Sequence, residues 1–449
     1  MKCTFALLIS GILLLSLPAS GQLMKIKTIA GNGIEGYSGD GMAATGANLH
    51  GPVSVALDPA GNVYFVDYFN LRVRKIAKST GVITTVAGTG VGGYTGDSSL
   101  ATSAEVDPQG VAFDKHGNMY IADGVYSVIR KVNTLGIITT IAGNGTHGYT
   151  GDNGPARSAS FSAPRGLTVD SFGNIFVADA PNNVIRKISA SGTITTVAGS
   201  GTAGYGGDGG PATAALLDSP YAVAVDHYGN LYISDYKNNV VRVVDSNGDI
   251  NAFAGTAGAF GYAGDNSAAI TATLNFPAGL AVDTFGNVII ADAHNNVIRS
   301  VNKFGVIRTV VGNGAAGFGG DLGNALGAQL LTPFSVATDI SGNIYIADAN
   351  NQRIREAYYD ALSVSSEFTR NNLEMHPNPS SSQISLSGLT KTDKVCVYDL
   401  AGSQIGTAWD VTTDGSQTFD IQSLASGVYV LQVFSADGNR KAVGQLVKE

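Results

Sequence analysis

The chain has 449 residues, of which 44% are hydrophobic and only 14% are charged. This composition excludes an intrinsically disordered chain and supplies enough apolar surface for a large core. The net charge of −8 argues against a nucleic-acid partner, because phosphate binding needs a basic surface that releases counterions. The 59 glycines suit many tight turns between short strands.

The first 21 residues have the features of a secretory signal peptide. Lys2 provides the positive start, residues 5–17 are mostly apolar, and residues 19–21 form a small-residue cleavage site. We therefore expect the mature chain to begin near Gln22. The apolar run is shorter than the ~20 residues that cross a bilayer, so we expect no transmembrane segment in the mature chain.

One short phrase recurs six times, with a Gly-Asn pair, an apolar run and a closing aspartate in each copy. Successive closing aspartates are 56, 56, 56, 57 and 56 residues apart. They are Asp67, Asp123, Asp179, Asp235, Asp292 and Asp348. A fixed period of this length indicates stacked supersecondary units that bury their apolar faces against one another.

Each repeat predicts four antiparallel strands, which in the third copy cover residues 166–170, 173–179, 182–188 and 192–199. Four such strands make one propeller blade, so six copies predict a six-bladed, all-β propeller over residues 22–360. The fourth-strand motif is missing after the sixth copy and stands instead at residues 24–31. We expect this N-terminal strand to complete the last blade and to leave no open sheet edge in the ring.

A long connector leads from each fourth strand to the next blade and contains a Gly-Asp pair. These aspartates are Asp40, Asp97, Asp152, Asp208, Asp265 and Asp321. They could coordinate calcium, or they could cap backbone amides in a tight turn. The loops lack the dense carboxylates of a calcium loop, so we expect the turn and no cofactor.

An arginine follows each closing aspartate by seven residues, on the predicted third strand. These arginines are Arg74, Arg130, Arg186, Arg242, Arg299 and Arg355. A residue present in every copy is best explained by the scaffold. We expect a blade-to-blade ion pair or hydrogen-bond strut.

Residues 25–358 resemble the NHL-repeat propellers through the motifs G-Y-x-G-D-G, G-N-x-Y-I-A-D, N-x-x-I-R-K and I-T-T-V-A-G. The resemblance implies a binding platform for proteins, nucleic acids or glycans, or, in a minority of members, a lyase with metal-binding histidines in the channel. The histidines here fall at unrelated positions of the repeat. We therefore predict no catalytic and no metal-binding residue.

Ligand-binding residues are expected where the copies differ. In a four-stranded meander the second turns and the connectors share one end of the blades, which we call the connector face. The first hairpins lie at the other end, the hairpin face. The candidates on the second turns are Tyr68, Phe69, Tyr126, Tyr236, Lys237, His294 and Asn350, and those at the channel mouth are Gln109, Arg165, Tyr221 and Phe334. This mixture suits a glycan or peptide surface, although loop residues also vary without any function.

After a linker at 361–373, residues 374–449 resemble the C-terminal sorting domain of the type IX secretion system of Bacteroidetes, a small Ig-like sandwich. The resemblance lies in Pro-Asn-Pro at 377–379, Val-Tyr-Asp-Leu at 397–400 and Leu-Ala-Ser-Gly-Val-Tyr at 424–429. It implies Sec export, passage across the outer membrane, and removal of the domain by the sortase of that machinery.

These observations predict a secreted or cell-surface recognition module that binds a protein or a glycan through its connector face. Two alternatives remain open. One is a secreted lyase or hydrolase that works in the propeller channel, and the other is a structural or adhesion component of the surface.

Overall fold

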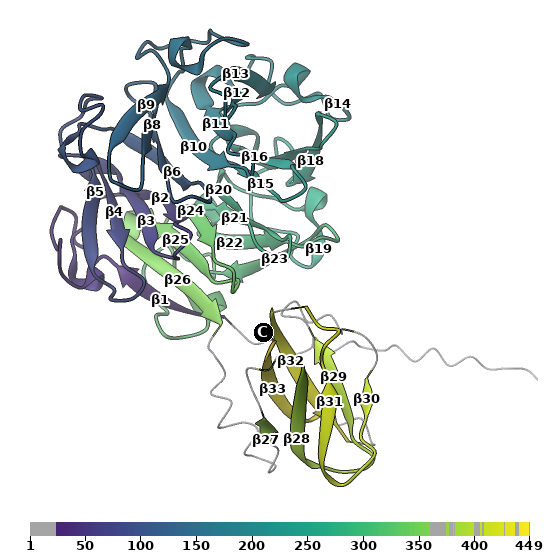
Figure 1. Cartoon of the computed structure of the whole chain (residues 1–449). Coiled ribbons are helices and arrows are strands. Elements are labelled where there is room, and N and C mark those ends of the chain that lie inside the picture. The colour runs from purple at the N-terminus through teal and green to yellow at the C-terminus, as the bar shows by residue number, and fades with distance from the viewer. Residues whose placement is uncertain are drawn as a thin grey trace, which may run out of the picture. The chain divides into compact units, whose positions relative to one another are not determined.

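The computed structural model describes residues 24–359, 374–376, 380, 382–398, 405, 408–425, 427–435 and 440–448. They belong to two compact units, Met24–Tyr359 and the part of the chain after it. Every regular element is a strand or a three-residue 3-10 helix, so the all-β prediction is confirmed (Figure 1). The predicted signal peptide and linker lie outside the described residues.

The larger unit consists of six antiparallel sheets that each have four full-length strands in meander order, which makes them the six predicted blades. Blade 1 contains β2 (Pro52–Leu57), β3 (Val63–Asp67), β4 (Arg72–Ile76) and β5 (Ile83–Ala87). Blades 2 and 3 contain β6 (Pro108–Phe113), β7 (Met119–Asp123), β8 (Val128–Val132), β9 (Ile138–Ala142), β10 (Pro164–Val169), β11 (Ile175–Asp179), β12 (Val184–Ile188) and β13 (Ile194–Ala198). Blades 4 and 5 contain β15 (Val223–Val225), β16 (Leu231–Asp235), β17 (Val240–Val244), β18 (Asp249–Ala254), β20 (Pro277–Val282), β21 (Val288–Asp292), β22 (Val297–Val301) and β23 (Val306–Val311), with the two-residue strands β14 (Gly210–Pro211) and β19 (Ser267–Ala268) added at their outer edges.

Blade 6 is assembled from both ends of the propeller. It contains β24 (Pro333–Thr338), β25 (Ile344–Asp348), β26 (Arg353–Tyr359) and the N-terminal strand β1 (Met24–Ala30). β1 pairs antiparallel with β26, from Met24 opposite Tyr359 to Ala30 opposite Ile354. The predicted closure of the ring by the N-terminal strand is confirmed, and Figure 1 shows β1 beside β26.

The core of the propeller lies between the blades. The second strand of every blade is buried along its whole length, which explains why its sequence is apolar on both faces. One representative cluster joins Val66 and Val73 of blade 1 to Val111 and Ile121 of blade 2. A single blade therefore has no core of its own and depends on its neighbours.

Each recurring arginine is fully buried and pairs with the aspartate of its connector, and all but Arg130 also pair with the closing aspartate of their blade. In blade 3, Nη2 of Arg186 lies 2.7 Å from Oδ1 of Asp152 in the connector, and Nη1 lies 3.8 Å from Oδ2 of the closing Asp179. The second oxygen of Asp152 accepts the backbone amide of Thr196 on the fourth strand at 3.1 Å. The predicted strut is present, but it ties a blade to the connector that enters it rather than to a neighbouring blade.

A second set of contacts does join neighbouring blades. The last residue of a second turn adopts a left-handed conformation, and its side chain accepts an amide from the end of the next connector. Thus Oδ1 of Asn183 accepts the amide of Ser219 at 2.9 Å, and Oδ1 of Asn239 accepts that of Phe276 at 2.9 Å. The corresponding residues of blades 1 and 2 are Leu71 and Ser127, so neither copy has an amide side chain here.

Each connector contains a three-residue 3-10 helix. Examples are η4 (Ala156–Ser158), which follows Pro155, and η6 (Ala212–Ala214), which follows Pro211. In every blade except blade 2 the second turn is a 3-10 helix as well, such as η5 (Ala180–Asn182) and η7 (Tyr236–Asn238).

The smaller unit has two antiparallel sheets. One contains β27 (Glu374–His376), β28 (Gln383–Leu389) and β31 (Gly415–Asp420), and the other contains β30 (Trp409–Asp410), β29 (Lys394–Tyr398), β32 (Gly427–Phe434) and β33 (Arg440–Lys448). Side chains of both sheets share one core, in which Leu386 and Phe419 meet Val395 and Leu431. This is the two-sheet arrangement expected of an Ig-like sandwich. The Pro-Asn-Pro motif lies outside the described residues.

No helix within the described part of the chain has the length and apolar character needed to cross a membrane.

Replacing Ile26 by alanine tests the closure of the ring. Ile26 is fully buried between blades 5 and 6, so the loss of its side chain should cost about 2–4 kcal/mol. We expect calorimetry of the full-length protein to show the propeller transition several degrees lower. The control is Lys27→Ala, which removes a partly exposed ion pair with Glu356 and a contact with the ring of Tyr358. Equal melting temperatures for Ile26→Ala and the wild type would contradict a closing role for β1.

Candidate functional site

The connectors and the second turns lie on the same face of the propeller, as predicted. The amide of Phe69 in the second turn of blade 1 donates to the carbonyl of His50 at 3.1 Å. In blade 3, Nδ2 of Asn182 donates to the carbonyl of Gly148 at 2.8 Å. Asn238, Asn295 and Asn351 make the equivalent contact in blades 4, 5 and 6. The variable side chains on this face therefore stand on hydrogen-bonded turns.

Three of the predicted residues meet over the mouth of the channel. The rings of Tyr221 and Phe334 are stacked, with centroids 5.8 Å apart and planes at 15°. They come from blades 4 and 6, and the residue between them in the ring, Ala278, is small and fully buried. The guanidinium of Arg165 lies 5.0 Å from the centroid of Tyr221 on blade 4.

Small residues directly below this level bring the inner strands together. A Cβ atom on Gly166 would lie 2.8 Å from the Cα of Ala222, and one on Gly279 would lie 2.5 Å from the Cα of Ser335. The amide of Gly166 donates to the carbonyl of Tyr221 at 3.0 Å. These glycines are required by the close approach of neighbouring backbones, and Gly166 fixes the position of Tyr221 just before β15.

An aromatic run leads outward from the channel mouth. Tyr221 packs on Tyr236 at 5.3 Å, Tyr236 on Phe276 at 4.9 Å, and Phe276 on His294 at 4.6 Å. Phe276 was not among the predicted site residues. It precedes the proline that opens β20 and has a positive φ of 51°, which is unusual for an aromatic residue. The sequence does distinguish Phe276, because none of the other five copies has an aromatic residue at this position of the repeat.

A cleft of about 450 Å³ adjoins this run between blades 3 and 4. Arg165, Tyr221, Tyr236 and Lys237 from the predicted set line it. Asp218 also lines the cleft and was not predicted, and one of its oxygens lies 3.6 Å from Nζ of Lys237.

The phenols of the cleft remain protonated at neutral pH. Burial raises the pKa of Tyr221 to about 12, although the nearby Arg165 charge acts in the opposite direction. Burial also raises the pKa of Tyr236, again against Arg165. Burial lowers the pKa of His294 below its usual value, so this imidazole is neutral at physiological pH.

The other predicted residues lie elsewhere on the connector face. Tyr68 packs on Phe69 at 4.7 Å, and Phe69 packs on His50 at 4.6 Å. Tyr126 lies 5.5 Å from the ring of Tyr94. Gln109 reaches Asp107 at 3.5 Å, and Asn350 donates to Oγ1 of Thr332 at 3.0 Å.

The inner strands of all six blades line a separate channel cavity of about 250 Å³. Its lining consists of valine, leucine, alanine, phenylalanine and threonine side chains. In the described residues no group of three or more His, Cys, Asp or Glu side chains is arranged to hold a metal ion.

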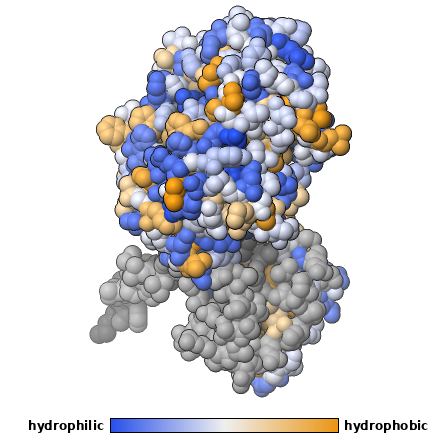
Figure 2. All heavy atoms as spheres, turned by 90° about the vertical axis from the view of Figure 1, so that its left-hand side faces the viewer, coloured by the Kyte–Doolittle hydropathy of each residue, from blue (hydrophilic) through white to orange (hydrophobic). Residues whose placement is uncertain are grey.

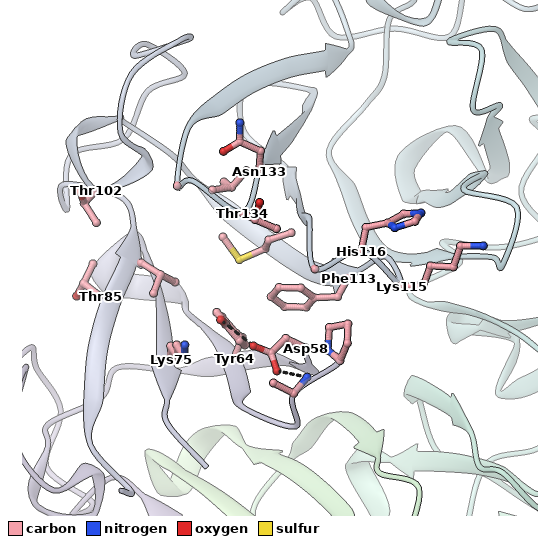
Figure 3. A pocket seen from close by; sticks show the side chains of 17 residues that line it. Asp58, Tyr64, Lys75, Thr85, Thr102, Phe113, Lys115, His116, Asn133 and Thr134 are labelled. Atoms are coloured by element: carbon pink, nitrogen blue, oxygen red, sulfur yellow. Dashed lines mark hydrogen bonds between the residues drawn. The ribbon is translucent and has the colours of Figure 1, made fainter. Parts of the chain in front are cut away.

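A larger hollow, about 560 Å³, lies on the hairpin face between blades 1 and 2. Figure 3 shows Tyr64 and Phe113 facing each other in it, with ring centroids 4.5 Å apart, whereas Lys115 and His116 extend away from Tyr64. The sequence-based prediction missed this hollow. The feature of the sequence that could have indicated it is the aromatic Phe113, since the other copies have Leu57, Val169, Val225, Val282 or Thr338 at that position.

Single exposed hydrophobic side chains also occur on the hairpin turns, including Phe172, Tyr228 and Ile340. On the side of the molecule that Figure 2 presents, hydrophobic side chains are scattered among hydrophilic ones. Isolated apolar residues of this kind are normal on a protein surface.

Asp123 of blade 2 differs from the other closing aspartates. In blades 3 to 6 an asparagine of the second turn donates to the closing carboxylate at 2.8 Å, whereas blade 2 has Tyr126 in this place. Oδ1 of Asp123 is buried without a hydrogen-bond partner. Burial raises the pKa of Asp123 to about 7, and the carboxyl of Asp107 adds to this shift against the opposing effect of Arg130.

The raised pKa of Asp123 predicts that the stability of the folded protein depends on pH. Between about pH 4 and pH 7 the folded protein keeps a proton on Asp123 that the unfolded chain has released, so the wild type loses stability as the pH rises through this range. Asp123→Asn removes the buried charge. We expect it to be more stable than the wild type by roughly 2–4 kcal/mol at pH 8 and by much less at pH 4. Thermal unfolding of both proteins across this range checks the prediction, and a difference that does not change with pH would contradict it.

Both units match known families. Residues 374–449 match the family described as Secretion system C-terminal sorting domain. Residues 91–150, 145–205 and 259–317 match the Teneurin NHL domain.

Curated relatives are similar to the chain over part of their own length. Human Teneurin-1 is 30% identical over 381 residues, which cover 75% of this chain and 13% of that protein. Mouse Teneurin-4 is 30% identical over 303 residues, which cover 56% of this chain and 10% of that protein. The chain thus spans only a small part of the length of these relatives.

Solved structures share the fold. A protein of unknown function from Bacteroides thetaiotaomicron has a TM-score of 0.56 at 19% identity, covering 74% of this chain and 75% of its own. An auxiliary nutrient binding protein from Bacteroides ovatus has a TM-score of 0.54 at 14% identity, covering 75% of this chain and 77% of its own. At these identities the likeness concerns the fold alone.

Proposed function

We propose that this NHL-repeat propeller, which carries a C-terminal sorting domain for type IX secretion, is a recognition module that binds a protein or a glycan through its connector face. The sorting domain marks proteins of Bacteroidetes for transport to the cell surface or the medium. The expected secreted or surface localisation is therefore confirmed, and the protein works in contact with extracellular molecules.

The observation that carries the proposal is the aromatic run from the channel mouth to the rim. Phe334, Tyr221, Tyr236, Phe276 and His294 form a chain of ring contacts between 4.6 and 5.8 Å. They come from blades 4, 5 and 6 and from the connectors between them. Large aromatic side chains lose little conformational entropy on binding, and they are typical of the centres of recognition surfaces.

The Tyr236→Ala variant tests the connector face. The full-length protein is applied to a glycan array and to an array of synthetic peptides, and binders of the wild type are then titrated against the variant. We expect at least a tenfold loss of affinity, because Tyr236 contacts both Tyr221 and Phe276 in the run. The matched control is Tyr228→Ala, which removes an exposed tyrosine of the same blade on the hairpin face. Equal losses in the two variants, or no binder on either array, would refute the proposal.

The type IX machinery and its sortase are the export partners in this proposal. Removing the chain after residue 373 deletes both sheets of the sorting unit and leaves the propeller intact. We expect the shortened protein to accumulate in the periplasm of a host with type IX secretion, while the full-length protein reaches the surface or the medium. Cell fractionation with immunoblotting measures this, and normal export of the shortened protein would show that the unit is not needed.

A further inference from the structure

The cleft between blades 3 and 4 contains one positive charge that no carboxylate balances. Its second cation, Lys237, lies 3.6 Å from Asp218, so these two charges offset each other. Arg165 has the ring of Tyr221 as its neighbour at 5.0 Å, and it forms no ion pair within the described residues. A planar guanidinium has five donors in a fixed fork, which suits it to a bidentate contact with a carboxylate.

Two phenols stand beside this guanidinium. Tyr221 and Tyr236 are stacked at 5.3 Å with planes at 30°, and the Arg165 charge influences the pKa of both. Because both phenols stay protonated at neutral pH, each can donate a hydrogen bond to an anionic or hydroxylated ligand.

Polar groups also line the cleft, and the rest of its lining consists of the small residues Ala180, Pro181 and Ala203. Oδ1 of Asn183 accepts the amide of Ser219 at 2.9 Å, which leaves the NH₂ group of Asn183 as a donor. The hydroxyl of Ser219 lies 3.1 Å from the carboxylate of Asp218, which can also accept from a ligand hydroxyl. The cleft thus combines flat rings with closely spaced donors and acceptors, a combination that suits a sugar ring.

From this arrangement we infer that the cleft binds a uronate residue of an acidic polysaccharide. This inference rests on the proposed recognition function of the connector face. The carboxylate of the uronate pairs with Arg165, its pyranose ring packs on Tyr236, and its hydroxyls meet Asn183 and Asp218. Neighbouring sugar rings of the polysaccharide continue along Phe276 and His294.

A sugar fits this cleft better than the side chain of an acidic peptide. A peptide ligand of this kind gains most of its affinity from apolar pockets for its other side chains. Apart from its tyrosines, the apolar lining of this cleft is limited to Ala180, Pro181 and Ala203, whose side chains are small. An aromatic run that continues for several rings instead suits a polymer of repeated rings.

The test uses the full-length protein and trisaccharides of galacturonate, glucuronate and mannuronate, with their methyl esters as neutral partners of nearly the same shape. We expect calorimetric titration to show at least tenfold tighter binding of one acid than of its ester, and weaker binding at higher salt. Arg165→Gln should bind the acid and the ester equally while its melting temperature stays unchanged. Lys75→Gln on the hairpin face is the matched control and should keep the preference for the acid.

The outcomes separate this inference from the proposed function. If the wild type binds acid and ester equally well, or if Arg165→Gln keeps the preference for the acid, the inference of a uronate site is wrong. The proposed recognition function of the connector face is not contradicted by either result. Tighter binding of a Glu-Tyr-Glu peptide than of every uronate trisaccharide would also overturn it. If no trisaccharide binds, the uronate inference fails, and the glycan and peptide arrays decide the proposed function by themselves.

Discussion

The propeller depends on a buried guanidinium in every blade, which pairs with a carboxylate of the incoming connector. Arg186 is fully buried, with Asp179 of its own sheet on one side and Asp152 of the incoming connector on the other. Removing one partner of a buried ion pair leaves an uncompensated charge, which costs about 3–5 kcal/mol. A connector therefore cannot move away from its blade without leaving the buried guanidinium unpaired, at this cost in free energy. The strut thus makes long, glycine-rich loops into fixed parts of the scaffold.

The repeat made the architecture predictable, because period, strand pattern and closure are all local features of the chain. The partners of the struts were harder to predict. Arg74 follows Asp67 by seven residues, which the sequence displays directly, but its second partner, Asp40, lies 34 residues before it in the connector. The contact from Asn183 to Ser219 crosses a blade boundary and is equally invisible without the fold. Periodicity shows which residues recur, and it does not show which of them touch.

The same limit applies to the candidate site. Comparing the copies placed Tyr221 and Phe334 at one level of the repeat, yet their stacking also needs the small Ala278 between them and the close approach at Gly279. Phe276 escaped prediction because it precedes the proline at the end of a connector, outside the second-turn and channel-mouth positions at which the copies were compared. Residues such as Asn350 and Gln109 lie on the connector face as predicted, but they contact other neighbours. The position of a residue in the repeat determines which face of the propeller it lies on, and it does not determine which residues of other blades it contacts.

A rigid scaffold determines what kind of recognition this surface can provide. The turn that carries Tyr236 is tied down by Asn238, which donates both to the closing Asp235 and to the carbonyl of Gly204 in the connector. Aromatic rings held on such turns give up little conformational freedom when a ligand binds, so more of the contact energy remains as affinity. A preformed row of rings favours ligands that are stiff themselves, and it disfavours flexible chains that must be ordered on binding. For this reason the geometry of the connector face, and not only its composition, favours a polysaccharide over a disordered peptide.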